Sequence, residues 1–335
     1  MTRAKRATRE DRMRTTLRWL MVPLVMLAAQ GAATAQSWPD RPIKFISSQA
    51  AGNATDLLAR IMADQLSPRL GQSIVVENRP GGGNVIGTTA AARAAPDGYT
   101  FFFATAAALV TDPYTFKSLP YDPMKDFVAV SKIAAVSFML LAHPSVPART
   151  LPELIALAKA EPDKFSIATD GQRRFSGMVA AWMNKLAGTR IAQIPYTAMT
   201  QSVQDAVAGR VQLVILGVPN AMGLATSGQL RPLGITSARR LPGLDHVPTI
   251  AETFPGFDFT GWWALTAPAG TPRPILERMN REVNDVLKQP ELQARLQKMY
   301  FYTDGGGTLQ QAHDYVHGQY VMWGTLVKEI GLQPE

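Results

Sequence analysis

Short apolar segments alternate with amphipathic helical patterns over most of the chain, from residue 42 to about residue 267. This alternation is typical of an α/β fold, in which helices cover the faces of a sheet. One helical pattern places five apolar residues on one face: Leu57, Leu58, Ile61, Met62 and Leu66. The predicted strands are residues 43–47, 73–77, 99–104, 131–142, 165–169, 191–195, 211–216, 231–236 and 257–267.

Further helices are predicted between these strands. An alanine-rich helix is expected to end at Ala95, and Thr150 with Glu153 three residues later forms a capping box that starts another. Gly209 is placed to end a third helix. The C-terminal tail is predicted to be mostly helical, over residues 272–296 and 309–330.

Two of the predicted strands, residues 131–142 and 257–267, are unusually long. In a two-lobed protein, such strands run from one lobe to the other and back. We therefore expect lobe 1 to comprise residues 36–136 and 264–335, with lobe 2 between them at residues 137–263. One continuous sheet is the alternative interpretation, and the pattern favours two lobes.

The first 35 residues have the three-part pattern of a secretory signal peptide. Seven basic and two acidic residues precede or flank an apolar run at 19–29, and Ala33-Thr34-Ala35 is a small-x-small cleavage site. The run is shorter than the roughly 20 residues that a membrane span needs. We expect residues 1–35 to be a cleaved Sec-type leader starting at Met1 or Met13, with an uncleaved anchor as the alternative.

The net charge of +8 is concentrated in this leader. Seven basic minus two acidic residues give the leader +5, which leaves +3 for the remainder of the chain. A body so close to neutral does not favour nucleic acid as a partner. The chain has no cysteine, which excludes disulfides, thiolate nucleophiles, cysteine-based zinc sites and a lipid-anchored export form.

Two sequence patterns resemble those of enzymes. His313 and His317 lie four residues apart, as in the zinc-protease motif His-Glu-x-x-His, but Asp314 replaces the glutamate and no third ligand is evident. Residues 81–87 (GGGNVIG) follow a predicted strand but miss the Gly-x-Gly-x-x-Gly spacing of a dinucleotide site. We therefore expect a solvated helix face and a tight turn, and no catalytic residue, metal or cofactor.

Three loops of mainly small or polar residues each lead into a predicted helix: residues 51–55, 81–84 and 170–174. Helix N-termini offer free N–H groups and partial positive charge, so they favour anions such as carboxylates. The first two loops belong to lobe 1 and the third to lobe 2, so a bound anion would draw the lobes together. Ordinary α/β loops are the alternative.

Several segments, in order along the whole mature chain, strongly resemble the substrate-binding proteins of tripartite tricarboxylate transporters, the Bug family of extracytoplasmic receptors. They are residues 39–43 (PDRPI), 55–56 (TD), 75–83 (VVENRPGGG), 92–100 (ARAAPDGYT), 119–127 (LPYDPMKDF), 151–159 (LPELIALAK), 236–238 (TSA), 247–249 (VPT) and 267–272 (APAGTP). The resemblance implies a type II-like periplasmic binding protein, with a cleft between two α/β lobes joined by crossing strands. It also implies a small organic acid as ligand, no cofactor, and membrane permease subunits as partners.

Candidate ligand-binding residues follow from the three loops and from the resemblance. They are Ser48, Gln49, Gly52, Asn53, Thr105, Ala106, Asp170, Gly171, Gln172, Arg173, Arg174, Phe175, Ser176, Tyr196 and Leu216. Several depart from the family pattern. Two arginines stand where the family has small and hydroxylic residues, and Leu216 replaces a frequently acidic strand end, which argues against an amino-acid ligand.

These departures predict a carboxylate with a sizeable apolar or aromatic portion, ahead of a compact polar acid such as citrate. One of Arg173 and Arg174 is expected to face the cleft and hold the carboxylate, while Phe175 covers the ligand body. The alternative places both arginines in solvent at the cleft rim. The leading hypothesis is a monomeric, non-enzymatic periplasmic receptor, with an exported metal-dependent hydrolase using His313 and His317, or a ligand-sensing subunit, as alternatives.

Overall fold

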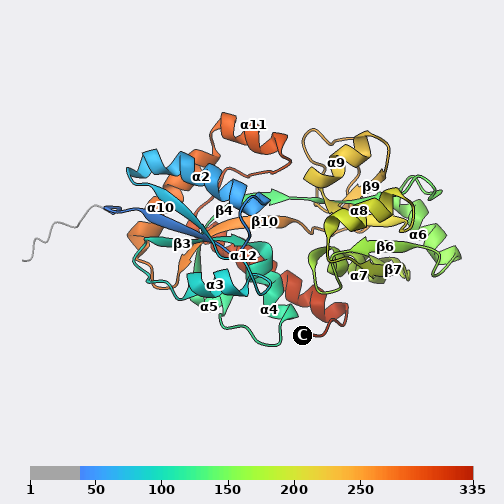
Figure 1. Ribbon diagram of the computed structural model, residues 1–335, viewed down its shortest axis with the longest axis horizontal. Coiled ribbons are helices and arrows are strands. Elements are labelled where there is room, and N and C mark those ends of the chain that lie inside the picture. Colours follow the sequence, from blue (N-terminus) through green and yellow to red (C-terminus); the bar gives the residue numbers. More distant parts are fainter. Residues whose placement is uncertain (1–37, 335) are drawn as a thin grey trace, which may run out of the picture. The chain divides into compact units, whose positions relative to one another are not determined.

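The computed structural model describes residues 38–334, of which those from Pro42 onward form one compact unit. The predicted signal peptide, residues 1–35, lies outside the described residues. The chain forms two mixed five-stranded sheets with helices packed on them, which confirms the α/β expectation (Figure 1). We call each sheet with its helices a lobe. No helix within residues 38–334 is long and apolar enough to cross a membrane.

The sheet of lobe 1 has the order β2-β1-β3-β10-β4. Strands β1, β2 and β3 run parallel, whereas β10 runs antiparallel to both β3 and β4. Phe45, Phe101 and Phe103 are completely buried and form its aromatic core. The strand bounds are β1 (Ile43–Ser47), β2 (Ile74–Asn78), β3 (Thr100–Thr105), β4 (Phe127–Val136) and β10 (Gly261–Pro268).

In the described part of the chain, lobe 1 contains seven α-helices and one short π-helix, η1, which follows β3. Helices α2 and α10 pack on each other and on the sheet, and α12 packs on β4 and η1. Their bounds are α2 (Ala54–Leu70), α3 (Val85–Ala92), η1 (Ala107–Thr111), α4 (Asp112–Thr115), α5 (Pro123–Asp126), α10 (Arg273–Leu287), α11 (Pro290–Lys298) and α12 (Leu309–Glu329).

The sheet of lobe 2 has the order β7-β6-β8-β5-β9, with β6, β7 and β8 parallel and β5 antiparallel to β8 and β9. Its strands are β5 (Phe138–Ala142), β6 (Ser166–Thr169), β7 (Ala192–Pro195), β8 (Leu213–Gly217) and β9 (Arg231–Ile235). Its helices are α6 (Leu151–Ala160), α7 (Phe175–Ala187), α8 (Met199–Val207), α9 (Val218–Thr226) and the 3₁₀ turn η2 (Ile250–Glu252).

Both long predicted strands connect the two sheets, but neither is one continuous strand. The segment 131–142 contains the end of β4 and all of β5, which belong to different sheets and are separated by Ser137. Ser137 accepts a hydrogen bond from Val218 N (2.9 Å), so the backbone changes pairing partners at that residue. In the returning segment, Phe259 N donates to Thr236 O (2.9 Å) in lobe 2, and β10 begins only at Gly261.

Helix predictions deviate at two places. Leu57 was expected on the buried face of α2, but it is 42% exposed while Leu58 is fully buried. The alanine-rich helix α3 ends at Ala92 instead of Ala95. Pro96 excludes the predicted end, because proline disfavours helical backbone in the residue before it, Ala95.

The C-terminal helix α12 is a third connection between the lobes. Its first part packs on β4 and η1, but Trp323 near its end lies 5.6 Å from the Phe175 ring and 5.3 Å from the Phe259 ring. Lys185 of α7 forms an ion pair with Glu329, the last residue of α12. The helix therefore ends against α7 of lobe 2.

Candidate functional site

A cavity of about 930 Å³ lies between the two sheets. It is large enough for a small organic molecule, whereas a separate apolar void inside lobe 2 measures only about 20 Å³ and has room for about one water molecule. The cavity wall is formed by Asn53, Ala54, Val136, Phe138, Ala168, Thr169, Asp170, Arg174, Ser176, Tyr196, Thr197, Met199, Ser202, Ile215, Leu216, Gly217, Pro219, Asn220, Trp263 and Phe301.

The loop between β6 and α7 forms one polar part of this wall. Asp170 Oδ1 accepts hydrogen bonds from Ser176 N (3.2 Å) and Ser176 Oγ (2.6 Å), and Asp170 N donates to Ser176 Oγ (2.8 Å). Gly177 is essential to this geometry, because a Cβ there would lie 2.1 Å from Gly171 O. The loop is therefore folded tightly onto the first turn of α7.

The two neighbouring arginines of this loop have different surroundings. Arg174 lines the cavity, and its guanidinium has no hydrogen bond or ion pair with the described part of the chain. Arg173 does not line the cavity, and its Nε donates to Gln333 O (2.9 Å) in the C-terminal segment. Arg174 is thus the arginine whose charge is directed to the cleft.

The charge of Arg174 affects carboxyl groups of both lobes. Asp170 is exposed along the cleft, yet the surrounding protein desolvates its carboxylate and raises its pKa, an effect that Ser176 and Arg174 oppose. In lobe 1, burial raises the pKa of Asp112 to about 7, against the hydrogen bond from Asn84 and the charge of Arg174. Asp112 is only 6% exposed and is the first residue of α4.

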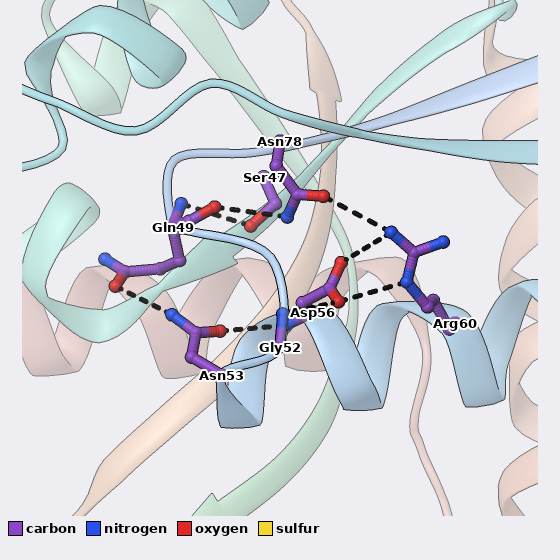
Figure 2. Close-up of polar contacts among 7 residues, drawn as sticks. All are labelled: Ser47, Gln49, Gly52, Asn53, Asp56, Arg60 and Asn78. Carbon is purple, nitrogen blue, oxygen red and sulfur yellow. Dashed lines mark hydrogen bonds and ion pairs between the residues drawn. The ribbon is translucent and has the colours of Figure 1, made fainter.

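The loop between β1 and α2 forms a hydrogen-bonded network that uses most of its own polar groups (Figure 2). Asn53 Oδ1 accepts from Asp56 N (3.0 Å), Asn53 Nδ2 donates to Gln49 Oε1 (3.2 Å), and Gly52 N donates to Asp56 Oδ2 (2.9 Å). The Arg60 guanidinium pairs with both oxygens of Asp56. The Asn53 side chain therefore caps one N–H group at the N-terminus of α2, and Asp56 is held by Gly52 N and Arg60.

The glycine-rich loop before α3 does not reach the cavity. Gly87 allows close packing, since a Cβ there would lie 2.6 Å from Ser48 Cα. Asn84, at the start of α3, binds the side chains of Ser48 and Gln49 and donates to Asp112 Oδ2 (2.9 Å). This loop was expected either to bind an anion or to be an ordinary tight turn, and the structure shows a tight turn inside lobe 1.

The remaining predicted site residues fall into two groups. Tyr196 lines the cavity while its hydroxyl donates to Asp205 Oδ2 (2.9 Å), and Phe175 instead packs inside the protein, stacked on Phe138 at 4.0 Å. The predicted residues in the cavity wall are Asn53, Asp170, Arg174, Ser176, Tyr196 and Leu216. Those outside the wall are Ser48, Gln49, Gly52, Thr105, Ala106, Gly171, Gln172, Arg173 and Phe175.

Sequence reasoning missed the aromatic wall contributed by lobe 1. Trp263 on β10 is 7% exposed, donates through Nε1 to Thr55 Oγ1 (2.8 Å) and meets the Phe301 ring edge-on at 5.2 Å. The Trp262-Trp263 pair in a predicted crossing strand was a signal for this position, but nothing in the sequence distinguishes Phe301. Thr169 was also missed, and its buried Oγ1 has no hydrogen bond within the described residues.

His313 and His317 lie away from this cavity. Their rings are 6.1 Å apart on α12 and line a void of about 20 Å³ with Leu109 and Val316. Within residues 38–334, no group of three or more histidine, aspartate or glutamate side chains is arranged to hold a metal ion.

Comparison with known proteins gives consistent matches over nearly the whole chain. The sequence model of the "Tripartite tricarboxylate transporter family receptor" matches residues 58–332. Protein BugT of Bordetella pertussis is 32% identical over 323 residues, covering 94% of this chain and 98% of BugT.

Two solved structures show the same fold at detectable sequence identity. One is Rpa4515 of R. palustris with adipate, with a TM-score of 0.76 and 31% identity over 89% of this chain and 100% of that chain. The other is MatC of Rhodopseudomonas palustris with bound malate, with a TM-score of 0.70 and 27% identity over 87% and 100% of the two chains.

Proposed function

Because the chain belongs to the family of tripartite tricarboxylate transporter receptors, we propose that it is a periplasmic receptor that binds a small carboxylate between its two lobes. The family consists of solute-binding receptors, and its members are periplasmic and work with tripartite transporters. We expect this chain to deliver its ligand to the membrane permease subunits of such a transporter, as a monomer and without catalysing a reaction.

The observation that carries this proposal is the Arg174 guanidinium in the cavity wall without a partner in the described residues. A guanidinium presents its N–H groups in a planar fork that matches the two oxygens of a carboxylate. Burying such a charge against a ligand is favourable only if the ligand supplies the opposite charge. A carboxylate at the N-terminus of α7 meets that requirement.

The apolar part of the wall supports a ligand with a hydrophobic body. Trp263 and Phe301 contribute aromatic surface from lobe 1, while Phe138, Ile215 and Leu216 contribute apolar surface from lobe 2. The related proteins named above bind adipate and malate. For this chain, the wall favours an acid with an apolar or aromatic portion over a compact acid such as citrate.

The lobe boundaries and the export route are part of the same proposal. Strands β4 and β10 lie in the first sheet and β5 in the second, which supports lobe 1 at residues 36–136 and 264–335 and lobe 2 at 137–263. A cleaved leader at residues 1–35 would deliver the receptor to the periplasm. The hydrolase alternative is not favoured, since His313 and His317 lie outside the cavity. The sensor alternative is not favoured, since receptors of this family work with tripartite transporters.

A two-step experiment tests the proposal. A thermal-shift screen of the purified protein against mono-, di- and aromatic carboxylates should find an acid that stabilises it, by about 2.7 kcal/mol at 100 times its Kd. Calorimetry with that acid should then show a loss of affinity of about 10- to 150-fold in Arg174→Gln, the equivalent of about 1.5–3 kcal/mol for a charged hydrogen bond.

Arg173→Gln is the matched control, because Arg173 is adjacent in sequence but binds the C-terminal segment. It should change the affinity by less than about twofold, a free-energy difference below roughly 0.5 kcal/mol. Failure of every carboxylate to stabilise the protein, or equal losses in the two variants, would contradict the proposed function.

A further inference from the structure

Two opposite charges share the cavity wall. Of the described residues that line the cavity, Asp170 and Arg174 are the two that carry a formal charge. They lie in the same loop at the start of α7, and the charge of Arg174 acts on the Asp170 carboxylate. No ion pair within 4.0 Å joins them. Each charge is therefore left to interact with something else in the cleft.

The two oxygens of Asp170 are used differently. Oδ1 accepts both hydrogen bonds from Ser176, whereas Oδ2 accepts none from the described residues. A carboxylate oxygen can accept two hydrogen bonds, and Asp170 is exposed along the cleft. Holding the loop to α7 thus occupies one oxygen and leaves the other as an acceptor for a ligand.

An acidic acceptor beside a basic group discriminates between ligands. A second carboxylate placed near Asp170 meets a like charge, which is unfavourable, whereas a hydroxyl or ammonium group can donate to Oδ2. A site that offers a buried or partly buried acceptor also disfavours an analogue without the donor, because the acceptor then loses its water partners without replacement. The wall is therefore complementary to one negative charge and one donor.

We propose that Asp170 is a specificity-determining residue that accepts a hydrogen bond from a hydroxyl or ammonium group of the ligand, so that the receptor prefers a monocarboxylate bearing such a donor to a dicarboxylate. This inference rests on the proposed function as a carboxylate receptor. It also revises the argument from Leu216 against an amino-acid ligand, since the residue directly after β6, Asp170, is acidic and lines the same cavity.

Asp170 also has a structural role at the start of α7, and the variant Asp170→Asn separates the two. Asparagine keeps the Oδ1 acceptor for Ser176 but replaces Oδ2 with an NH₂ donor and removes the charge. Asp122→Asn is the matched control, because Asp122 likewise accepts a hydrogen bond from a helix N-terminal N–H (Met124 N, 3.0 Å) but lies outside the cavity wall.

The test is calorimetry with four six-carbon acids that differ at one end: hexanoate, 6-hydroxyhexanoate, 6-aminohexanoate and adipate. The wild type should bind 6-hydroxyhexanoate or 6-aminohexanoate at least tenfold more tightly than hexanoate and adipate. The difference in affinity between 6-hydroxyhexanoate and 6-aminohexanoate shows whether the preferred donor is a hydroxyl or an ammonium group. Asp170→Asn should reduce that preference at least tenfold and bind adipate more tightly than the wild type does. Its melting temperature and that of Asp122→Asn should stay close to the wild-type value.

Two results overturn the inference. If adipate binds the wild type most tightly, or if Asp170→Asn changes all four affinities by one factor, Asp170 does not select the ligand. In both cases the loss of affinity in Arg174→Gln would still uphold the carboxylate site. If none of the four acids binds and no other carboxylate does, the proposed function fails and the inference fails with it.

Discussion

Replacing Asp112 by asparagine should remove the decrease in stability that ionisation of this carboxyl causes between pH 5 and pH 8. Asp112 is buried at the start of α4, and its Oδ2 accepts from Asn84 Nδ2 (2.9 Å). Burial raises its pKa from 3.8 to about 7, although Asn84 and Arg174 act in the opposite direction. Burial raises the pKa of the Tyr121 hydroxyl, and the charge of the nearby Asp112 raises it further.

The sign follows from proton binding in the two states. Between pH 3.8 and about pH 7 the folded protein keeps the Asp112 proton while the unfolded chain has lost it. The contribution of Asp112 to stability is therefore largest below pH 3.8, falls as the pH rises, and levels off above about pH 7. Between pH 5 and pH 7 this contribution to the free energy of unfolding falls by roughly 1.4 kcal/mol per pH unit, which gives a decrease of about 2–3 kcal/mol.

Asparagine cannot ionise, and its side-chain oxygen can still accept from Asn84. The free energy of unfolding of Asp112→Asn, from urea denaturation, should therefore rise relative to the wild-type value by about 2–3 kcal/mol from pH 5 to pH 8.

Asp122→Asn serves as the control, because Lys125 lowers the pKa of Asp122 and any contribution is lost only on acidification below this range. A difference between Asp112→Asn and wild type that is the same at pH 5 and pH 8 would refute the reasoning.

Three further outcomes are expected. Gly87→Ala should destabilise the protein by about 1–3 kcal/mol in thermal or urea denaturation, because its Cβ would lie 2.6 Å from Ser48 Cα. Gly223→Ala in α9, where a Cβ would have no atom within 4 Å, should leave stability unchanged or raise it by up to about 1 kcal/mol. A Gly87→Ala variant more stable than Gly223→Ala would contradict this packing. Thr169→Val should leave stability unchanged or raise it by up to about 2 kcal/mol, since it removes a buried hydroxyl that lacks a partner in the described residues. A clear loss of ligand affinity in this variant would show that the ligand forms a hydrogen bond with that hydroxyl. Small-angle scattering should show a smaller radius of gyration with saturating ligand, with bending near residues 134–138 and 262–265, and an unchanged radius would count against a large closure.

The sequence identified most strands because their apolar patterns end at glycine, proline or polar residues. The break at Ser137 was not visible, because the apolar pattern continues from β4 into β5 and only the pairing partners change. Local patterns report the conformation of a segment. They do not report which sheet it joins.

The site was predictable where its residues follow the ends of strands. Asp170 comes directly after β6 and Arg174 ends the loop that follows, and loops at that edge converge on a cleft. The choice between Arg173 and Arg174 depends on Gln333 O, and the burial of Phe175 depends on Phe138 and Trp323. These partners are distant in the sequence, so spacing alone could not indicate them.

The aromatic packing of lobe 2 is complete only when the end of helix α12 is present. The polypeptide is synthesised from its N-terminus, so every strand of the second sheet exists before Trp323 and Glu329 do. Until those residues arrive, the rings of Phe175 and Phe259 lack an aromatic neighbour that the finished protein gives them. A chain that stops before Trp323 would therefore expose aromatic surface on lobe 2, although none of the missing residues belongs to that lobe's sheet.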